Sequence, residues 1–230
     1  MTDPVQTLSR SLGADVRTLS SVSQNVANMH TPGYRAVRAV PVFQPDASVA
    51  ESASVVSTAF DQRDGALAQT SGALDVALRG PGFFVIERDG RALLARSGAF
   101  RTDDEGRLVT ATGDAVMGYS GELRLPAGEV HIGRDGQVSV GTTNVGQLQI
   151  VAVGEPARLH PAGDGAYAYD GPLAEWRGAV VQGALEHGNV DAADETVRLM
   201  ELTRHAESVQ RAISVYDKAM ETGINQIGGN

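Results

Sequence analysis

The chain has 230 residues, enough for one or two domains, and 42% of them are hydrophobic while 20% are charged. This composition excludes a wholly disordered chain and leaves enough apolar material for a folded core. The formal net charge of -9 disfavours nucleic-acid binding, which needs a basic surface. The absence of cysteine excludes disulfides, thiolate zinc sites and cysteine nucleophiles. We expect neither a transmembrane helix nor a cleaved signal peptide, because no apolar run is long enough and the N-terminus has no cationic start.

A long helix is predicted from about Pro4 to Met29. Asp3 is a good N-cap, and Pro4 suits the first helical position because its missing N–H has no partner there. Apolar residues follow the three- and four-residue spacing of a heptad seam, which Asp15 interrupts. This seam consists of Val5, Leu8, Leu12, Leu19, Val22, Val26 and Met29.

The segment after this helix predicts a sharp turn and then an extended connector. Pro32 and Gly33 suit the two central positions of a type II turn. Residues 37–64 show no clear period, and their prolines and serines indicate an extended connector with a strand or two.

Residues 65–181 have the pattern of many short β-strands. Asp89-Gly90 and Asp135-Gly136 each separate two apolar segments and predict hairpins. Residues 147–153 alternate between apolar and polar side chains and predict a further strand. Short strands at intervals of about ten residues favour an all-β domain of the barrel or sandwich type.

A second long helix is predicted to begin near Asp191, a suitable N-cap, with Asp194 and Glu195 at the positive end of the helix dipole. Its heptad seam is Leu199, Leu202, Ala206, Val209, Ile213, Tyr216 and Met220. Such narrow seams favour pairing of helix with helix, although two amphipathic helices packed on a globular core remain the alternative.

No motif in the sequence predicts catalysis or a bound cofactor. No two of the five histidines have the three- or four-residue spacing of a local metal pair, and no nucleophile elbow or phosphate-binding loop is present. Asp75 and Glu87 could be considered as a glycosidase pair, but carboxylates are common in this acidic chain. We therefore expect a structural protein without catalytic, cofactor or metal site; a hydrolase would need a polar cluster assembled in space.

Four segments resemble, in order along the chain, the flagellar basal-body rod and hook family. The family's N-terminal signature is similar to residues 23–36, SQNVANMHTPGYRA. The segments that follow it in the family resemble residues 72–86, GALDVALRGPGFFVI, and residues 96–119, RSGAFRTDDEGRLVTATGDAVMGY. The approach to the family's closing helix resembles residues 183–211, GALEHGNVDAADETVRLMELTRHAESVQR. Ala73 stands where the family usually has proline, and His187-Gly188 where it often has a small polar residue.

The resemblance implies a structural subunit of the flagellar rod, which polymerises into a hollow drive shaft that transmits torque and allows export. It implies contacts with other copies of the chain and with neighbouring rod proteins, export by the flagellar type III apparatus, and a place in the rod across the periplasm. It implies no nucleic acid and no membrane insertion. The single β domain and the short segment before it favour the proximal-rod type. The alternatives are the distal-rod type and a non-flagellar secreted β-rich structural protein or adhesin.

The expected fold is α+β, with an all-β domain flanked by coiled-coil-type helices that pair in the assembled rod. Its parts are an N-terminal helix and turn at 1–36, the connector at 37–64, the β domain at 65–181 and the C-terminal helix at 182–230. The expected assembly interface combines seam and signature residues: Val5, Leu8, Leu12, Leu19, Val22, Asn25, Val26, Asn28, Thr31, Pro32, Gly33, Tyr34, Asn189, Val190, Asp191, Leu199, Leu202, Val209, Ile213, Tyr216 and Met220.

Overall fold

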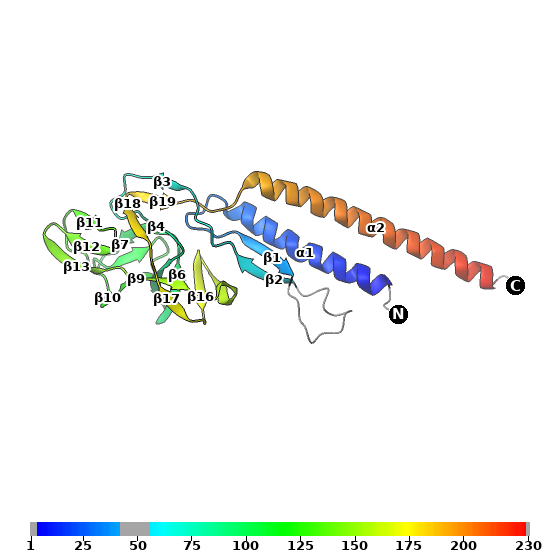
Figure 1. Cartoon of the computed structure of the whole chain (residues 1–230), viewed down its shortest axis with the longest axis horizontal. Helices are drawn as coiled ribbons and strands as arrows, with labels where there is room; N and C mark the ends of the chain where they lie inside the picture. The colour runs from blue at the N-terminus through cyan, green and yellow to red at the C-terminus, as the bar shows by residue number, and fades with distance from the viewer. Residues whose placement is uncertain (1–3, 42–55, 229–230) are drawn as a thin grey trace. The chain divides into compact units, whose positions relative to one another are not determined.

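The computed structural model describes residues 4–41 and 56–228, with the side chains of 11–40, 59–216, 218, 219, 221 and 222 (Figure 1). The chain divides into two compact units. The first unit contains residues 1–26, 37–58 and 191–230, and the second contains residues 27–36 and 59–190. The turn after the first helix thus belongs to the same unit as the β-rich region, a grouping that differs from the division expected from sequence.

The first unit holds two helices and a small sheet. Helix α1 spans Pro4–Asn28 and helix α2 spans Ala192–Gly228. Strand β1 (Val37–Pro41) pairs with β2 (Val56–Phe60), and the connecting residues of the expected connector lie outside the described part. Asp191 caps α2, since its Oδ1 accepts hydrogen bonds from the backbone N–H groups of Ala193 at 2.8 Å and Asp194 at 3.3 Å.

The second unit is built from antiparallel strands in one large and three small sheets among the described residues. The large sheet has the order β15-β16-β6-β5-β9-β8-β7, with β10 on β9, β14 on β5 and β17 on β14. Its strands are β5 (Phe83–Arg88), β6 (Arg91–Ala95), β7 (Phe100–Thr102), β8 (Leu108–Thr110), β9 (Ala115–Gly118), β10 (Gly121–Glu122), β14 (Ile150–Val153), β15 (Leu159–Gly163), β16 (Ala166–Tyr169) and β17 (Leu173–Glu175).

Two of the small sheets pair segments from opposite ends of this unit. β4 (Val76–Arg79) pairs with β18 (Ala179–Gln182), and β3 (Leu67–Gln69) pairs with β19 (Ala184–Glu186). The remaining sheet joins β11 (Val130–Ile132), β12 (Gln137–Val140) and β13 (Thr143–Gln147), and a short 3-10 helix spans Pro156–Arg158. These pairings hold residues near 187 close to residues near 65.

The two expected hairpins are confirmed. β5 and β6 pair across Asp89-Gly90, where both residues have positive φ (51° and 73°), as a type I′ turn requires. β11 and β12 pair across 133–136, with Ile132 opposite Val138. Their inward side chains join a single apolar cluster in which the rings of Phe84 and Phe100 meet edge to face at 5.0 Å.

Two expectations about the strands need correction. The large sheet is open, ending at β15 and β7 with no pairing that closes a barrel among the described strands. The strand expected at 147–153 is divided, because Leu148 and Gln149 leave the ladder and their N–H groups bond to Gly136 and Met117 instead. The α+β class itself is confirmed.

Candidate functional site

The turn after α1 has the geometry expected from its sequence. The Tyr34 N–H donates to the Thr31 carbonyl at 3.2 Å, and Gly33 has a φ of +69°. A Cβ atom on Gly33 would lie only 2.4 Å from the backbone nitrogen of Ser97. The Gly33 N–H also donates to the Glu186 carbonyl at 2.7 Å. The turn therefore needs glycine at position 33 for two reasons: φ is positive there, and the turn lies against the backbone of residues 96–97.

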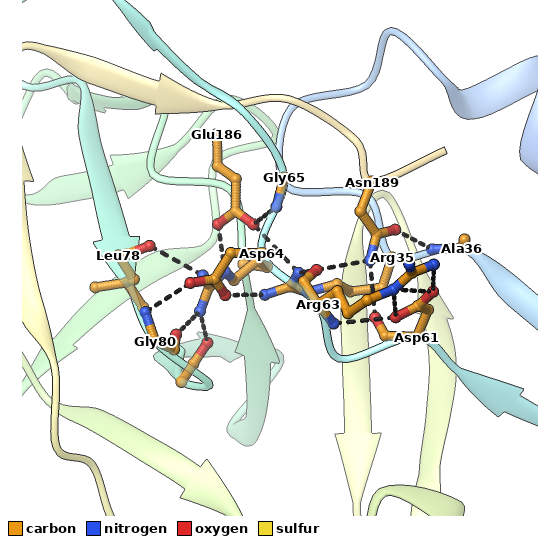
Figure 2. A network of polar contacts seen from close by, with 12 residues as sticks. Arg35, Ala36, Asp61, Arg63, Asp64, Gly65, Leu78, Gly80, Glu186 and Asn189 are labelled. Carbon is orange, nitrogen blue, oxygen red and sulfur yellow. Dashed lines mark hydrogen bonds and ion pairs between the residues drawn. The ribbon is translucent and has the colours of Figure 1, made fainter. Parts of the chain in front are cut away.

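Next to this turn lies a group of four charges, three of them buried, which we call the arginine cluster: Arg35, Arg96, Asp64 and Glu186 (Figure 2 labels Arg35, Asp64 and Glu186). The Arg96 side chain is fully buried, yet every N–H of its guanidinium has a partner. Nε donates to Glu186 at 2.5 Å, Nη1 donates to the carbonyls of Gly80 and Gly82, and Nη2 donates to Asp64 and to the Leu78 carbonyl. Arg96 thus links the C-terminal end of β4 and the following residues, 78–82, to Glu186 at the end of β19.

Arg35 approaches the same two carboxylates from the turn. Its Nη1 lies 3.2 Å from Glu186 Oε1 and donates to the Arg63 carbonyl, and its Nη2 lies 3.4 Å from Asp64 Oδ1. Its Nε is buried without a hydrogen-bond partner among the described residues. The Arg35 N–H donates to the hydroxyl of Tyr167 at 3.4 Å, and burial raises the pKa of that tyrosine, while Arg35 opposes the rise.

The charges of the arginine cluster balance. The Glu186 side chain is 2% exposed and that of Asp64 is 39% exposed, so one carboxylate is inside and the other reaches solvent. Burial, followed by the positive charge of Arg35, lowers the pKa of Arg96, and Glu186 and Asp64 oppose that shift. An arginine stays protonated at physiological pH even so, and the two carboxylates compensate the two cations. Removing one member would leave a buried charge unpaired.

Asn189 extends this network to the residues that follow the turn. Its Oδ1 accepts from the Ala36 N–H at 2.6 Å, and its Nδ2 donates to the carbonyls of Asp61 and Arg63 at 2.9 and 2.8 Å (Figure 2). Its own N–H donates to the Tyr34 carbonyl at 3.2 Å. One residue near the C-terminal end of the unit thus joins residues 34–36, through its backbone and its side chain, to residues 61–63.

Within the first unit, strand β1 is bound to both helices. The Asn25 Oδ1 on α1 accepts from the Val37 N–H at 2.7 Å, and its Nδ2 donates to the Val37 carbonyl at 2.9 Å. The next residue, Arg38, forms an ion pair with Glu195 on α2, whose side chain is fully buried. Adjacent residues of β1 therefore hold the C-terminal part of α1 and the N-terminal part of α2.

The structure places the predicted interface residues in different environments. Asn25, Gly33, Tyr34, Val22 and Val209 are buried. Asn28, Thr31, Pro32, Asn189, Val190, Leu202, Ile213 and Tyr216 are half-buried. Leu12, Leu19, Val26, Asp191 and Leu199 are exposed, and the side chains of Val5, Leu8 and Met220 lie outside the described part. Of the α1 seam, the described leucines and Val26 thus face solvent in the single chain.

The arginine cluster is not predicted by the sequence. Arg35, Arg96 and Glu186 lie in three of the four segments that resemble the rod and hook family, but the predictions from those segments concern turns, strands and apolar residues. The local signal is weak: each of these charged residues has an apolar neighbour, namely Ala36, Ala95 and Leu185. Sequence alone does not tell which of 19 basic and 28 acidic residues will meet.

No group of three histidine, aspartate or glutamate side chains that could hold a metal ion occurs among the residues that the structure describes. Over the same residues, no helix combines the length and the hydropathy that crossing a membrane requires.

The second unit is thus an antiparallel β-rich unit in which the glycine turn and the arginine cluster lie together. The model of the "Flagellar hook protein FlgE/F/G D1 domain" matches residues 77–140, and that of the "Flagellar basal body rod FlgEFG protein C-terminal" matches residues 181–227.

Similar proteins match along nearly the whole chain. The flagellar basal-body rod protein FlgG of Agrobacterium fabrum is 32% identical, with 90% of this chain and 92% of that protein covered. FlgF of Escherichia coli K12 is 30% identical with the same coverage, and FlgF of Caulobacter vibrioides is 29% identical with 92% of each chain covered. The chain belongs to the flagellar basal-body rod and hook protein family.

Proposed function

We propose that this chain is a structural subunit of the flagellar basal-body rod, without enzymatic activity. The observation that carries this proposal is the match to FlgF and FlgG rod proteins over about nine tenths of both chains. The similar hook protein FlgE of Rhizobium meliloti favours a hook role less, because the match covers only 35% of that protein.

Within the rod, we place the chain in the proximal part. Its alignment with FlgF of Caulobacter vibrioides spans 228 positions and that with FlgF of Escherichia coli spans 233, close to its own length of 230 residues. The alignment with FlgG of Agrobacterium fabrum spans 245 positions, so it needs more gaps. The distal-rod type, represented by FlgG, is the second candidate, supported by its slightly higher identity of 32%.

The solvent-facing side of α1, which we call its outer face, is the proposed assembly surface. Leu12, Leu19 and Val26 are 38–43% exposed, and Val16 lies on the same stripe with 59% exposure. An open helical polymer needs such a surface to meet a different surface on the next copy. Burying one large aliphatic side chain contributes about 1.5–3 kcal/mol, so this stripe can drive association with other copies and with neighbouring rod proteins. The remaining seam and signature residues would support this interface from α2 and the turn.

This role requires that the subunit leave the cytoplasm through the flagellar type III export apparatus, without a cleaved signal, and reach the rod in the periplasm. No cofactor, nucleic acid or membrane insertion is part of the proposal. The remaining alternative, a secreted β-rich structural protein or adhesin outside the flagellum, shares the β-rich unit but does not require export by that route.

The proposal is tested by deleting the gene and restoring it with a variant that carries an epitope between Asp104 and Glu105, which are exposed in a turn. Loss of motility in the deletion strain, with the restored epitope detected in isolated basal bodies at the membrane-side end of the rod, is the expected result. An epitope at the outer end would assign the distal type instead. A motile deletion strain would contradict a rod function and favour the secreted structural protein.

In the same strain, Leu19→Arg should abolish incorporation, because an arginine on the stripe puts a charge into an apolar contact. The control is Arg101→Ala, an exposed change in the β-rich unit, which should incorporate normally. Normal incorporation of both variants would show that the outer face of α1 is not the assembly surface.

A further inference from the structure

One face of the large sheet extends beyond the apolar core and ends in an open groove. On β5 and β6, Arg88 lies opposite Arg91, two residues beyond the last pair that packs in the core. On β15 and β16, His160 lies opposite Ala168. These four residues, with Ala162 and Asp170, line a cavity of about 660 Å³. We call it the hairpin groove, because both the β5–β6 and the β15–β16 hairpins line it.

The walls of the hairpin groove are held in position within the chain. Arg88 donates to Asp114 at 2.7 and 2.8 Å and to the carbonyl of Ala162 on β15 at 3.2 Å. The floor carries the small side chains of Ala162 and Ala168, both half-buried, which leave space above them. The hairpin groove is therefore a preformed surface that can receive a flat side chain.

Tyr119, which directly follows β9, has the side chain that suits this groove. In the described part of the second unit, Tyr119 and Leu173 are the only large apolar side chains that are exposed, at 63% and 55%. The Tyr119 hydroxyl donates to the carbonyl of Ile150 at 3.4 Å, so the phenol oxygen faces its own chain while the ring is open to solvent. Leu173 lies only three residues from Asp170, on the same side of the unit as the groove.

Tyr119 cannot reach the hairpin groove of its own chain. The strand order β16-β6-β5-β9 places it three strand spacings from Ala168, about 14 Å. The pairing of β5 with β9 places it level with Phe83, at the other end of β5 from Arg88, about 17 Å along the strand. Tyr119 and the groove thus lie at opposite corners of one sheet. A contact between them joins different surfaces of two copies, which produces an open chain of subunits.

The charges beside the two surfaces are complementary. Next to Tyr119, Glu122 lies 3.5 Å from Arg107, which two further carboxylates contact at 2.8 and 3.4 Å, and Glu122 also lies 3.5 Å from Arg124. Three carboxylates therefore share two arginines. At the groove, Arg91 is exposed and forms no ion pair among the described residues. Two acidic side chains also line the groove, so the attraction depends on Arg91 facing these carboxylates and not on the net charge of the groove.

We propose that the ring of Tyr119 in one copy packs on the alanine floor of the hairpin groove in the next copy, with Glu122 placed toward Arg91. This contact links the β-rich units of neighbouring copies and is separate from the contact through the outer face of α1. It rests on the proposed rod function, because it requires that copies of the chain assemble.

Cross-linking in isolated basal bodies tests the contact, because the chain has no cysteine of its own. Ser120 is next to Tyr119 and Asp170 lines the groove, and within one chain they are about 20 Å apart, too far for a short bismaleimide. A chain with Ser120→Cys and Asp170→Cys should give a ladder of dimers and larger multimers, whereas each single variant should stay monomeric. The two single variants expressed together should stop at dimers, because each copy then carries one reactive surface.

Further changes make this test specific. In the double-cysteine chain, Tyr119→Ser should remove the ladder, and Tyr119→Phe should keep it because the ring enters the groove and the hydroxyl does not. Thr142→Cys in place of Asp170→Cys, at an exposed position between β12 and β13, should give no ladder. A ladder with Thr142→Cys, no ladder with the original pair, or a product joined to a protein of another mass would each overturn the contact.

A pair of variants without cysteine tests the contact independently. Arg91→Glu should lower the amount of subunit in basal bodies about tenfold, because like charges would then face each other across the contact. Arg134→Glu makes the same change of charge at an exposed position outside the groove and should incorporate normally. Equal incorporation of the two variants would overturn the proposal. Absence of the unmodified chain from basal bodies would instead contradict the rod function, so the failures of the two proposals are distinguishable.

Discussion

The side-chain amide of Asn25 bonds to both backbone polar groups of Val37, donating to its carbonyl and accepting from its N–H. The amide thereby takes the place of a neighbouring strand for one residue of β1, so α1 and β1 are joined at a buried site without exposing the strand's backbone. The contact therefore joins the last turns of α1 to the first residue of β1.

Replacing Asn25 tests that contact. We expect Asn25→Ala to lower the free energy of unfolding by about 2–4 kcal/mol, because the N–H and carbonyl of Val37 each lose a partner in a buried site. Asn25→Asp should be at least as damaging, since a carboxylate cannot donate to the carbonyl and is fully buried there. Urea denaturation followed by circular dichroism measures both, with exposed Ser23→Ala as the control. An Asn25→Asp variant as stable as the parent would contradict this account.

The arginine cluster gives a second prediction, at Arg96. Arg96→Lys keeps the charge but loses two of five donors and the planar fork, so at least two buried acceptors are left without a partner. We expect a loss of about 2–4 kcal/mol in unfolding free energy. Arg101→Lys, on the exposed surface of the same unit, should change stability by less than about 0.5 kcal/mol. Equal effects of the two variants in the same denaturation experiment would mean that the charge alone matters.

Local structure was predictable where one or two residues decide it. The hairpin at Asp89-Gly90, the turn at Pro32-Gly33 and the cap at Asp191 each depend on a backbone conformation or hydrogen bond available to few residue types. The start of α1 at Pro4 likewise follows from local chemistry. These features therefore agree with the structure to within a residue or so.

The remaining features depend on contacts that are distant along the chain. Glu186 meets Arg96 across 90 residues, and Asn189 meets Ala36 across 153, and no local pattern marks such pairs. The strand expected at 147–153 is divided because the N–H groups of Leu148 and Gln149 donate to the carbonyls of Gly136 and Met117, which are distant along the chain. The period of α1 predicts an apolar seam, but period alone does not say that the smaller residues, and not the leucines, are shielded within the chain.

A third prediction concerns Gly33, with Gly90 as a matched control. Both have positive φ, but a Cβ on Gly33 would lie 2.4 Å from the Ser97 nitrogen, whereas one on Gly90 would meet nothing within 4 Å. Gly90→Ala should cost only the conformational strain, about 1–2 kcal/mol. Gly33→Ala should cost clearly more, because the turn must move away from the backbone at 96–97 and weaken its bond to Glu186. Thermal unfolding measures the stability of the two variants. Similar losses of stability would mean that the turn does not pack closely against the backbone at 96–97.

The last prediction concerns acid stability and Asp114. Hydrogen bonds from Arg88, at 2.7 and 2.8 Å, and from Thr112 hold the pKa of Asp114 below its usual range, against the opposing effect of burial. A carboxylate whose pKa is lowered by folding contributes stability that is complete above the unfolded value, about 3.9, and is lost as the pH falls through the folded value.

Asp114→Asn removes this contribution. At pH 7 the variant should be less stable by about 1–3 kcal/mol, because Arg88 loses a charged acceptor. As the pH falls below about 4, the parent chain loses the same contribution, so the difference in unfolding free energy between the two should shrink toward zero. Urea denaturation at intervals between pH 7 and pH 2 measures that difference. Asp104→Asn makes the same change of charge on an exposed side chain and controls for net charge. A difference that stays constant or grows on acidification would show that the pairing with Arg88 does not stabilise the folded chain.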